Sequence, residues 1–378
     1  MTWTEGLLSS VVPDLRPSHS VERLISRVAE VVLTTLRLAH YDNNFTQDEV
    51  LQRTWCFVEE MRKDGATFSI LRVLQSPTNY VKMEFNNKTY RFEMIPLASA
   101  MGDKKRSSLL GNKWKTKEYL MKYSMPTAKG CSFFFLHKKR ALLYGERLGY
   151  PLVVKPLNGS VSRHVTTNIS NNEELLSAIN FACDYSPWFI VERYIKCASL
   201  YRATVIDFDH VFITQILPAN ITGDGENTIN SLIIRKNKIR ERDTKKERLL
   251  HPLIIDNITD TLLKEQGVTM DTVPEKDSRI FLQRDPFPRL GYDLREVTPL
   301  AHKDIINLCK KVARLFDVRV VGIDILIPDI TISSPEDETV IIEANSAPCI
   351  ELHHFPSEGE PTSPARALRE MFLKYYVK

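Results

Sequence analysis

Two acidic residues and an asparagine near the C-terminus, Asp324, Glu343 and Asn345, have the types and the spacing of a metal site. They belong to two β-rich runs, Val320–Ile327 and Thr339–Asn345, whose polar connection predicts a hairpin with a long loop. A roughly symmetric hairpin places Asp324 opposite Glu343, and Asn345 shares the face of Glu343 because side chains alternate along a strand. Two carboxylates this close repel each other unless a cation lies between them. Such oxygen donors suit Mg²⁺ bound together with substrate phosphates, although two acids on a solvated sheet face would give the same pattern.

Two lysine sites lie earlier in the chain. A basic stretch leads into a helix whose first turns carry Lys113, Lys115 and Lys117, a pattern that is also typical of a solvated, lysine-rich helix. Lys155 ends the short apolar strand Leu152–Lys155, where an ammonium group should be paired or bound to an anion. The sequence therefore offers two positive groups for a phosphate ligand.

The loop that follows, Asn158–Val165, is rich in small hydrogen-bond donors. Its backbone amides and hydroxyls could hold phosphate oxygens, and Arg163 adds positive charge. Gly159 is its only glycine, and the chain contains no Walker motif. The loop by itself is therefore a weak indication of a phosphate site.

Composition bounds the class of protein. The chain has 378 residues, 43% hydrophobic and 26% charged, which is typical of a soluble protein with two or three subdomains. Its apolar runs are too short to span a membrane and its N-terminus has no basic leader, so we expect a cytoplasmic protein without a membrane partner. The six cysteines form no C-x-x-C pair, which disfavours disulfides and zinc. A net charge of +4 is too small to indicate a nucleic-acid partner.

The order of predicted elements indicates an α+β protein. Residues 1–105 are expected to form an N-terminal α+β scaffold or docking domain with helices over Val21–His40 and Asp48–Lys63 and a hairpin over Tyr80–Pro96. Later strands and helices do not alternate as βαβ units, so a dinucleotide-binding fold is not expected. A helix is predicted over Thr298–Val318. The basic run Arg235–Arg248 is either a solvated segment or a flexible lid over an anionic ligand.

Taken in order, these motifs resemble the ATP-grasp superfamily, most closely the ATP-grasp domain of cyanophycin synthetases and bifunctional glutathione synthetases. The resemblance covers about two thirds of the chain, from Lys113 to Phe372. It rests on NKWKTKEYL, GYPLVVKPLNGSVSRHVT, FIVERYI, the pair Tyr201-Arg202, VGIDIL, IIEANSAP and HHFPSEG.

The resemblance implies an ATP-grasp fold, in which two α+β subdomains grip ATP, over residues 106–378. Residues 106–150 would form a linking subdomain. Residues 151–217 would form the small subdomain with its hinge strand, and residues 218–378 the large subdomain with the Mg²⁺ site. It also implies an ATP-dependent carboxylate–amine ligase that forms an amide through an acyl phosphate and releases ADP and phosphate. Amino acids or short peptides are the expected substrates, with Mn²⁺ as a substitute for Mg²⁺, and a homo-oligomer is left open. The alternative is a nucleotide-binding module, a sensor or subunit, without turnover.

Residue roles follow from the matched motifs. Lys113 and Lys155 are expected to hold phosphates, and the backbone of the hinge strand at Glu192, Arg193 and Tyr194 is expected to meet the adenine. The small-residue loop, with Asn158, Gly159, Ser160, Ser162 and Arg163, is expected to cover the β- and γ-phosphates. Arg202 and Arg284 are expected at the reacting groups, and Asp324, Glu343 and Asn345 at Mg²⁺.

The chain also departs from the family pattern. Val161 and His164 make the phosphate loop stiffer, no acid that could bind ribose follows the hinge strand, and Cys349 replaces a glycine. The segment Arg284–Tyr292 replaces a small-residue loop near the acceptor site. The substrate is therefore expected to differ from those of the named enzymes.

Overall fold

The computed structural model describes residues 30–96, 104–158, 163–195, 199–242, 249–333 and 339–377. The chain divides into two compact units, Met1–Pro96 and Leu97–Lys378, whereas the sequence places this boundary after residue 105. Every pairing between the named strands is antiparallel. This confirms the α+β class. None of the described helices combines the length and apolar character that a membrane span needs.

The first unit contains a four-stranded sheet of order β1-β2-β3-β4 and the helix α3 (Gln52–Arg62). The strands are β1 (Ala39–Asp42), β2 (Thr67–Val73), β3 (Ser76–Phe85) and β4 (Lys88–Glu93). The predicted hairpin is confirmed, because Asn86 and Asn87 both have positive φ (50° and 59°) and connect β3 to β4.

Two helix predictions in this unit have wrong boundaries. The helix expected up to His40 ends before it, because Arg37 is left-handed (φ 57°) and β1 then begins; the residues before 30 lie outside the described part of the chain. The second helix is α3, preceded by a separate 3-10 turn over Gln47–Glu49. Val50 is extended between them (φ −129°, ψ 163°) and interrupts the helix.

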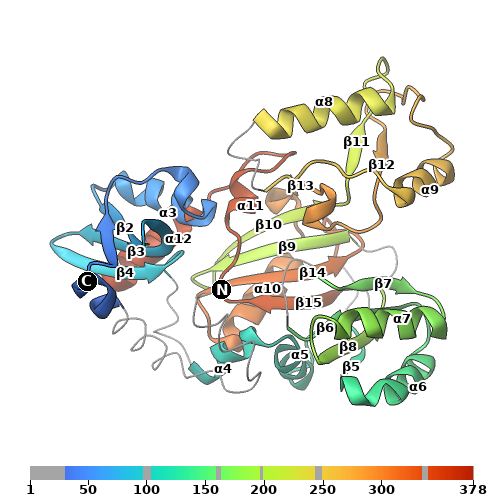
Figure 1. Ribbon diagram of the computed structural model, residues 1–378, viewed down its shortest axis with the longest axis horizontal. Coiled ribbons are helices and arrows are strands. Elements are labelled where there is room, and N and C mark those ends of the chain that lie inside the picture. The colour runs from blue at the N-terminus through green and yellow to red at the C-terminus, as the bar shows by residue number, and fades with distance from the viewer. Residues whose placement is uncertain are drawn as a thin grey trace. The chain divides into compact units, whose positions relative to one another are not determined.

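The second unit is built on a five-stranded sheet of order β13-β10-β9-β14-β15 (Figure 1). Helix α10 (Lys303–Phe316) buries Cys309, Val312 and Phe316 in the same apolar core as the inward side chains of the sheet. Its predicted start is wrong, since Thr298–Leu300 forms a separate 3-10 turn. The strands are β9 (Ser199–Ile206), β10 (His210–Leu217), β13 (Asp293–Glu296), β14 (Val320–Ile327) and β15 (Val340–Asn345).

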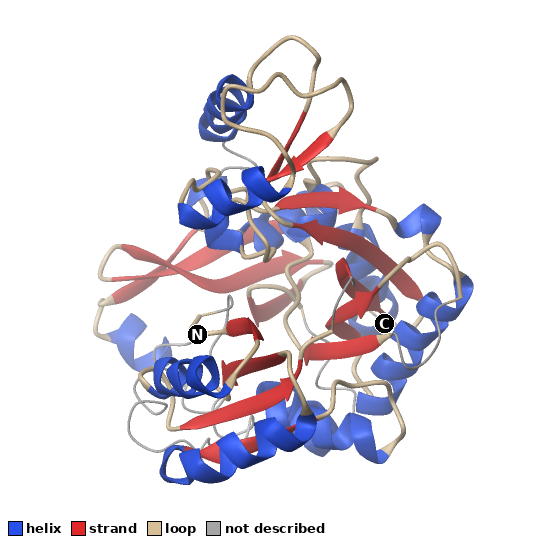
Figure 2. Cartoon of the chain, turned by 90° about the vertical axis from the view of Figure 1, so that its right-hand side faces the viewer, coloured by secondary structure: helices blue, strands red, loops and turns tan. Residues whose placement is uncertain are grey.

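A second, smaller sheet of order β5-β8-β6-β7 belongs to the same unit and has a core of its own. Helices α6 (Lys138–Leu148) and α7 (Asn172–Cys183) cover one of its faces and share its core (Figures 1 and 2). Helix α6 and strand β5 were not predicted from the sequence. The strands are β5 (Gly130–Phe134), β6 (Leu152–Pro156), β7 (Thr166–Ile169) and β8 (Trp188–Arg193).

A third group of elements carries part of the basic run. Helix α8 (Ile229–Arg242) and helix α9 (Asn257–Glu265) lie with the two-stranded sheet of β11 (Asn220–Thr222) and β12 (Arg279–Phe281). Within α8, the side chain of Arg240 is 4% exposed and binds Asp293, which Lys236 also contacts. These two basic residues are therefore held within the fold, whereas Arg235 and Lys238 of the same helix are exposed, as expected for a solvated segment.

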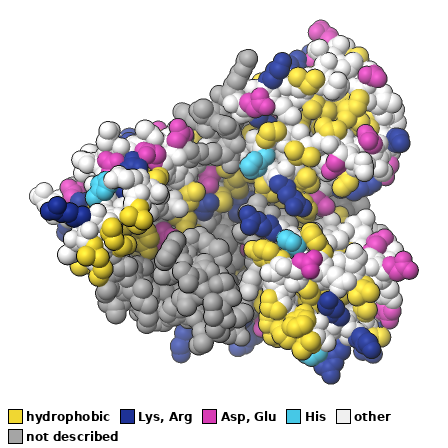
Figure 3. Space-filling view, viewed as in Figure 1, with side chains coloured by type: hydrophobic (Ala, Val, Ile, Leu, Met, Phe, Trp, Pro, Cys, Tyr) yellow, Lys and Arg dark blue, Asp and Glu magenta, His cyan; other side chains and the backbone are white. Residues whose placement is uncertain are grey.

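The remaining helices are α4 (Lys104–Ser108), α5 (Lys113–Lys122), α11 (Glu351–His354) and α12 (Pro364–Tyr376). On the face of the molecule seen in Figure 3, Lys and Arg side chains lie among Asp and Glu side chains. The visible described surface is thus mixed in charge.

Candidate functional site

The hairpin of β14 and β15 has the register that the sequence predicts. Asp324 pairs with Glu343, and Gly322 pairs with Asn345 two residues along. Asp324, Glu343 and Asn345 are partly exposed, whereas Ile323 and Ile325 between them are buried. The acidic face of the hairpin therefore points away from the α10 core.

Arg202 lies on the strand on the other side of Asp324, so that Arg202, Asp324 and Glu343 form a row of charged residues across three strands. In β9 it lies directly opposite Asp324, and its Nη2 donates to Asp324 Oδ2 at 2.8 Å while its Nε binds the second carboxylate oxygen. Both side chains are only 16% exposed. Burial alone would lower the pKa of the guanidinium, but Asp324 outweighs this effect and raises the pKa. The two-point contact fixes both groups.

Lys113 approaches the same patch from helix α5. Asn112 caps this helix, because its side chain accepts hydrogen bonds from the backbone N–H groups of Trp114 and Lys115. The cap sets the first turn so that Lys113 Nζ lies 3.7 Å from Glu343 Oε2. The Lys113 side chain is 18% exposed and that of Glu343 is 33% exposed. A loose ion pair therefore borders the carboxylate patch.

A second acidic centre lies on β8. Each carboxylate oxygen of Glu192 is 2.5 Å from an ammonium group, Oε1 from Lys155 and Oε2 from Lys117. All three side chains are less than 10% exposed. Gly130 lies opposite Glu192 in β5, where a Cβ atom would come within 2.6 Å of the Glu192 Cβ. The absence of a side chain at this position is what allows the strands to pack around Glu192.

The electrostatics of this trio are those of one anion between two cations. Burial by itself raises the pKa of the Glu192 carboxyl, but Lys155 and Lys117 outweigh it and lower the pKa to about 2. Burial also lowers the pKa of Lys117, against the attraction of Glu192. The trio carries a net charge of +1 when all three groups are ionised, which favours an anion nearby.

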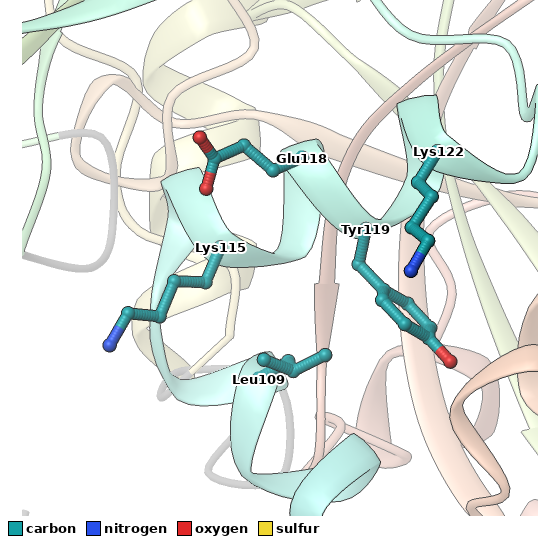
Figure 4. Close-up of a pocket in the computed structure, with 5 residues that line it drawn as sticks. All are labelled: Leu109, Lys115, Glu118, Tyr119 and Lys122. Atoms are coloured by element: carbon teal, nitrogen blue, oxygen red, sulfur yellow. The ribbon is translucent and has the colours of Figure 1, made fainter.

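Helix α5 has two different lysine faces. Lys113 and Lys117, one turn apart, contact Glu343 and Glu192. Lys115 and Lys122 instead line a shallow surface pocket of about 230 Å³ together with Glu118, Tyr119 and Leu109. Figure 4 shows Lys115 and Lys122 directed to this side of the helix. Position on the helix therefore separates lysines that belong to the candidate site from lysines that do not.

The donor set of the hairpin fits a small hard cation. Its oxygens come from two carboxylates and one amide, which is what Mg²⁺ accepts when phosphates supply further ligands. A Cβ atom at Gly322 would lie 2.8 Å from Asn345 Oδ1 and 3.0 Å from the Pro348 Cβ. The Asn345 amide oxygen thus lies over the bare backbone of Gly322. Among the described residues no three His, Cys, Asp or Glu side chains gather as a metal site; the hairpin brings together two carboxylates and an amide.

Other residues predicted for the site have different surroundings. Arg284 is about half exposed and pairs with Glu265 of α9 at 2.6 Å. Within the described ranges, this contact directs Arg284 to α9 and not to the hairpin. Arg163 is exposed and Asn158 is half-buried. Gly159, Ser160 and Ser162 lie outside the described residues.

The hinge backbone is partly used within the fold. The N–H of Arg193 donates to Lys129 O at 2.9 Å, and that of Tyr194 donates to Pro151 O at 3.0 Å. These two N–H groups are therefore used within the fold.

Lys117 is the residue of this centre that sequence reasoning did not select. Its signal in the sequence is its spacing, because it follows Lys113 by one turn and so shares that face of the helix. His353, from the HHFPSEG motif, is fully buried. Its ring nitrogens contact Thr214 and Thr204 at 2.7 and 2.9 Å, so it supports the sheet from within.

Comparison with known proteins agrees with this architecture. No protein-family model matches the chain. A cyanophycin synthetase from Geminocystis herdmanii is 31% identical over 260 residues, which are 68% of this chain and 30% of that protein. A bifunctional glutathione biosynthesis protein from Pasteurella multocida is 27% identical over 259 residues, 67% of this chain and 34% of that protein. The chain thus spans about a third of the length of these relatives.

Among solved structures, a bifunctional glutathione synthetase from Pasteurella multocida superposes with a TM-score of 0.61 at 21% identity. The match covers 85% of this chain and 44% of that one. The sequence relatives confirm the resemblance expected from the ordered motifs, and the superposition confirms the ATP-grasp fold.

Proposed function

We propose that the protein is an ATP-dependent carboxylate–amine ligase that forms an amide through an acyl phosphate. The observation that carries this proposal is the convergence of Lys113 on Glu343, directly opposite the Arg202–Asp324 pair. Phosphoryl transfer requires positioning and charge neutralisation more than covalent help, and alternating charges of this kind supply both. The similarity to synthetases of the same fold supports it.

In this proposal each side chain has a separate task. Lys113 and Lys155 hold phosphate oxygens of ATP, and Asp324, Glu343 and Asn345 hold Mg²⁺. Arg202 orients Asp324 and offers positive charge to the reacting carboxylate or phosphate. Bound Mg²⁺ would neutralise phosphate charge and polarise the γ-phosphate.

The substrates are proposed to be amino acids or short peptides, as the names of the relatives suggest for those proteins. Water has to be kept from an acyl phosphate, because hydrolysis would consume the intermediate without forming an amide. In this protein, Thr167 of β7 donates to Asp285 at 2.8 Å. This contact joins the small sheet to the 284–292 loop and would help to close the site.

The test is a pairwise screen of amino acids and short peptides with ATP and Mg²⁺, read by mass spectrometry. We expect one pair to give a product lighter than the sum of its substrates by one water, with stoichiometric ADP and phosphate. Binding of ATP without ADP formation with any pair would favour the non-catalytic nucleotide-binding module. Failure to bind ATP at all would remove both functions. Repeating the active pair with Mn²⁺ tests whether this ion substitutes.

A further inference from the structure

The buried trio of Lys117, Glu192 and Lys155 poses a problem for nucleotide binding. Both oxygens of Glu192 are engaged, each by one lysine at 2.5 Å. An ammonium group in such a contact has much of its charge neutralised. Lys155 therefore has to loosen from Glu192 before it can bind a phosphate strongly.

That movement would be unfavourable if Lys155 were the only partner of Glu192. A carboxylate that is 7% exposed would be left buried and unpaired, and breaking a buried pair in this way is strongly destabilising. Lys117 removes the difficulty, because it remains on the other oxygen of the same carboxylate.

We propose that Lys117 is a positioning residue that keeps Glu192 neutralised while Lys155 turns from Glu192 to a phosphate of the bound nucleotide. The inference rests on the proposed function, since it requires that the chain binds ATP.

The surroundings of the two lysines favour this division of roles. Lys117 lies on a capped helix between Thr116, whose hydroxyl donates to Leu109 O at 2.8 Å, and the buried Leu120. Its backbone is therefore held firmly. Lys155 lies near the end of β6, directly before the loop that contains Asn158.

The charge balance points the same way. Both burial and the neighbouring Lys155 charge lower the pKa of Lys117, while Glu192 raises it. Two ammonium groups thus compete for one carboxylate. An incoming phosphate relieves this competition, because it gives each lysine an anionic partner of its own.

The experiment is a double-mutant cycle on the full chain with ATP–Mg²⁺ and adenosine as probes. We expect Lys117→Met to raise the Kd for ATP about 30-fold or more, because Lys155 is then the only partner of Glu192. The Kd for adenosine, which has no phosphate, should change less than about twofold. Calorimetric titration measures both.

The decisive variant is the double substitution Lys117→Met with Glu192→Gln. It removes the carboxylate that retains Lys155, so ATP affinity should recover to within about threefold of Glu192→Gln alone. Lys117→Arg, which keeps the charge, should also bind ATP nearly as the unchanged protein does. Lys115→Met on the other face of α5 is the matched control and should bind both probes normally.

Each outcome has a distinct meaning. A double variant that stays as weak as Lys117→Met would show that Lys117 contacts the nucleotide itself and would overturn the inference. Equal weakening of ATP and adenosine would leave Lys117 with a purely structural role, which also overturns it. If Lys117→Met fails to fold, the double variant still decides, because ATP binding tenfold weaker than that of Glu192→Gln contradicts the proposal. An unchanged protein that binds no ATP would instead reject the proposed function.

Discussion

Helix α5 brings a lysine to each of two glutamates, and the two pairs differ in every physical respect. Glu192 is 7% exposed and has an ammonium group at 2.5 Å from each oxygen. Glu343 is 33% exposed, and its lysine lies 3.7 Å away. The first carboxylate is saturated, whereas the second is bordered by charge and open on one side.

The comparison shows how burial decides what a carboxylate can do. In a low-dielectric environment an anion must be paired on all sides, so Glu192 is committed to the fold. At the water boundary a loose pair contributes little to stability. Glu343 therefore stays available for a ligand, and identical residue types serve opposite purposes.

The largest effect that separates the two acids is expected from Glu343→Gln. Loss of this anion should lower ligase turnover by at least about 10³-fold, because the metal and the phosphates lose a charged ligand. ADP release with the active substrate pair measures it, and the melting temperature should remain close to that of the unchanged protein. Glu370→Gln on an exposed turn of α12 serves as the control. Normal turnover in Glu343→Gln would remove the metal assignment.

For Glu192→Gln, in contrast, the main expected effect is a loss of stability. Two buried ammonium groups lose their common partner, and the free energy of unfolding should fall by about 3 kcal/mol. Urea denaturation followed by circular dichroism measures this change. If Glu192→Gln lowered the free energy of unfolding less than Glu343→Gln does, Glu192 would not be the structural acid of the two.

A smaller effect is expected from displacing the Asn345 amide of the hairpin. Gly322→Ala would place a Cβ atom 2.8 Å from Asn345 Oδ1, so the amide must turn away while the sheet remains intact. We expect turnover to fall about 10- to 100-fold through this displacement. Stability, measured in the same denaturation experiment, should fall only modestly, because the Pro348 Cβ at 3.0 Å also has to move. A variant with normal turnover would show that Asn345 is not a metal ligand.

A last test is the pH dependence of the buried trio of Lys117, Glu192 and Lys155. The pKa of Glu192 is lowered from 4.5 to about 2 in the folded protein. Its contribution to stability is therefore present above pH 4.5 and is lost as the pH falls toward 2. The stability difference between the unchanged protein and Glu192→Gln should narrow over that window. A difference that stays constant from pH 6 to pH 3 would contradict the assignment.

The hairpin could be predicted because its information is local. Alternation along Val320–Ile327 assigns Asp324 to one face, and two-residue spacing does the same for Glu343 and Asn345. Their pairing then follows from a roughly symmetric antiparallel hairpin, and the structure confirms it. Arg202 as a third member of the row could not be derived this way, since it depends on which strand lies beside β14.

The buried trio shows where such inference stops. Lys117 and Glu192 are 75 residues apart, and only tertiary packing brings their two elements together with β6. The basic run has the same limitation, because the partner that buries Arg240 is Asp293, far along the chain. Long-range pairing of charges is set by topology and carries no periodic signal in the sequence.

The spacing of the two lysines on α5 has a mechanical consequence. One turn of helix, about 5.4 Å, connects a contact on β8 of the small sheet to a contact on β15 of the large one. Any rotation of one sheet against the other must stretch at least one of these contacts. Leu120 and Tyr119 of α5 pack in the core of the large sheet, and Ile341 of β15 donates to Pro126 O just after the helix. The helix is therefore expected to move with the large sheet, so that a rotation of the small sheet stretches the Lys117–Glu192 contact.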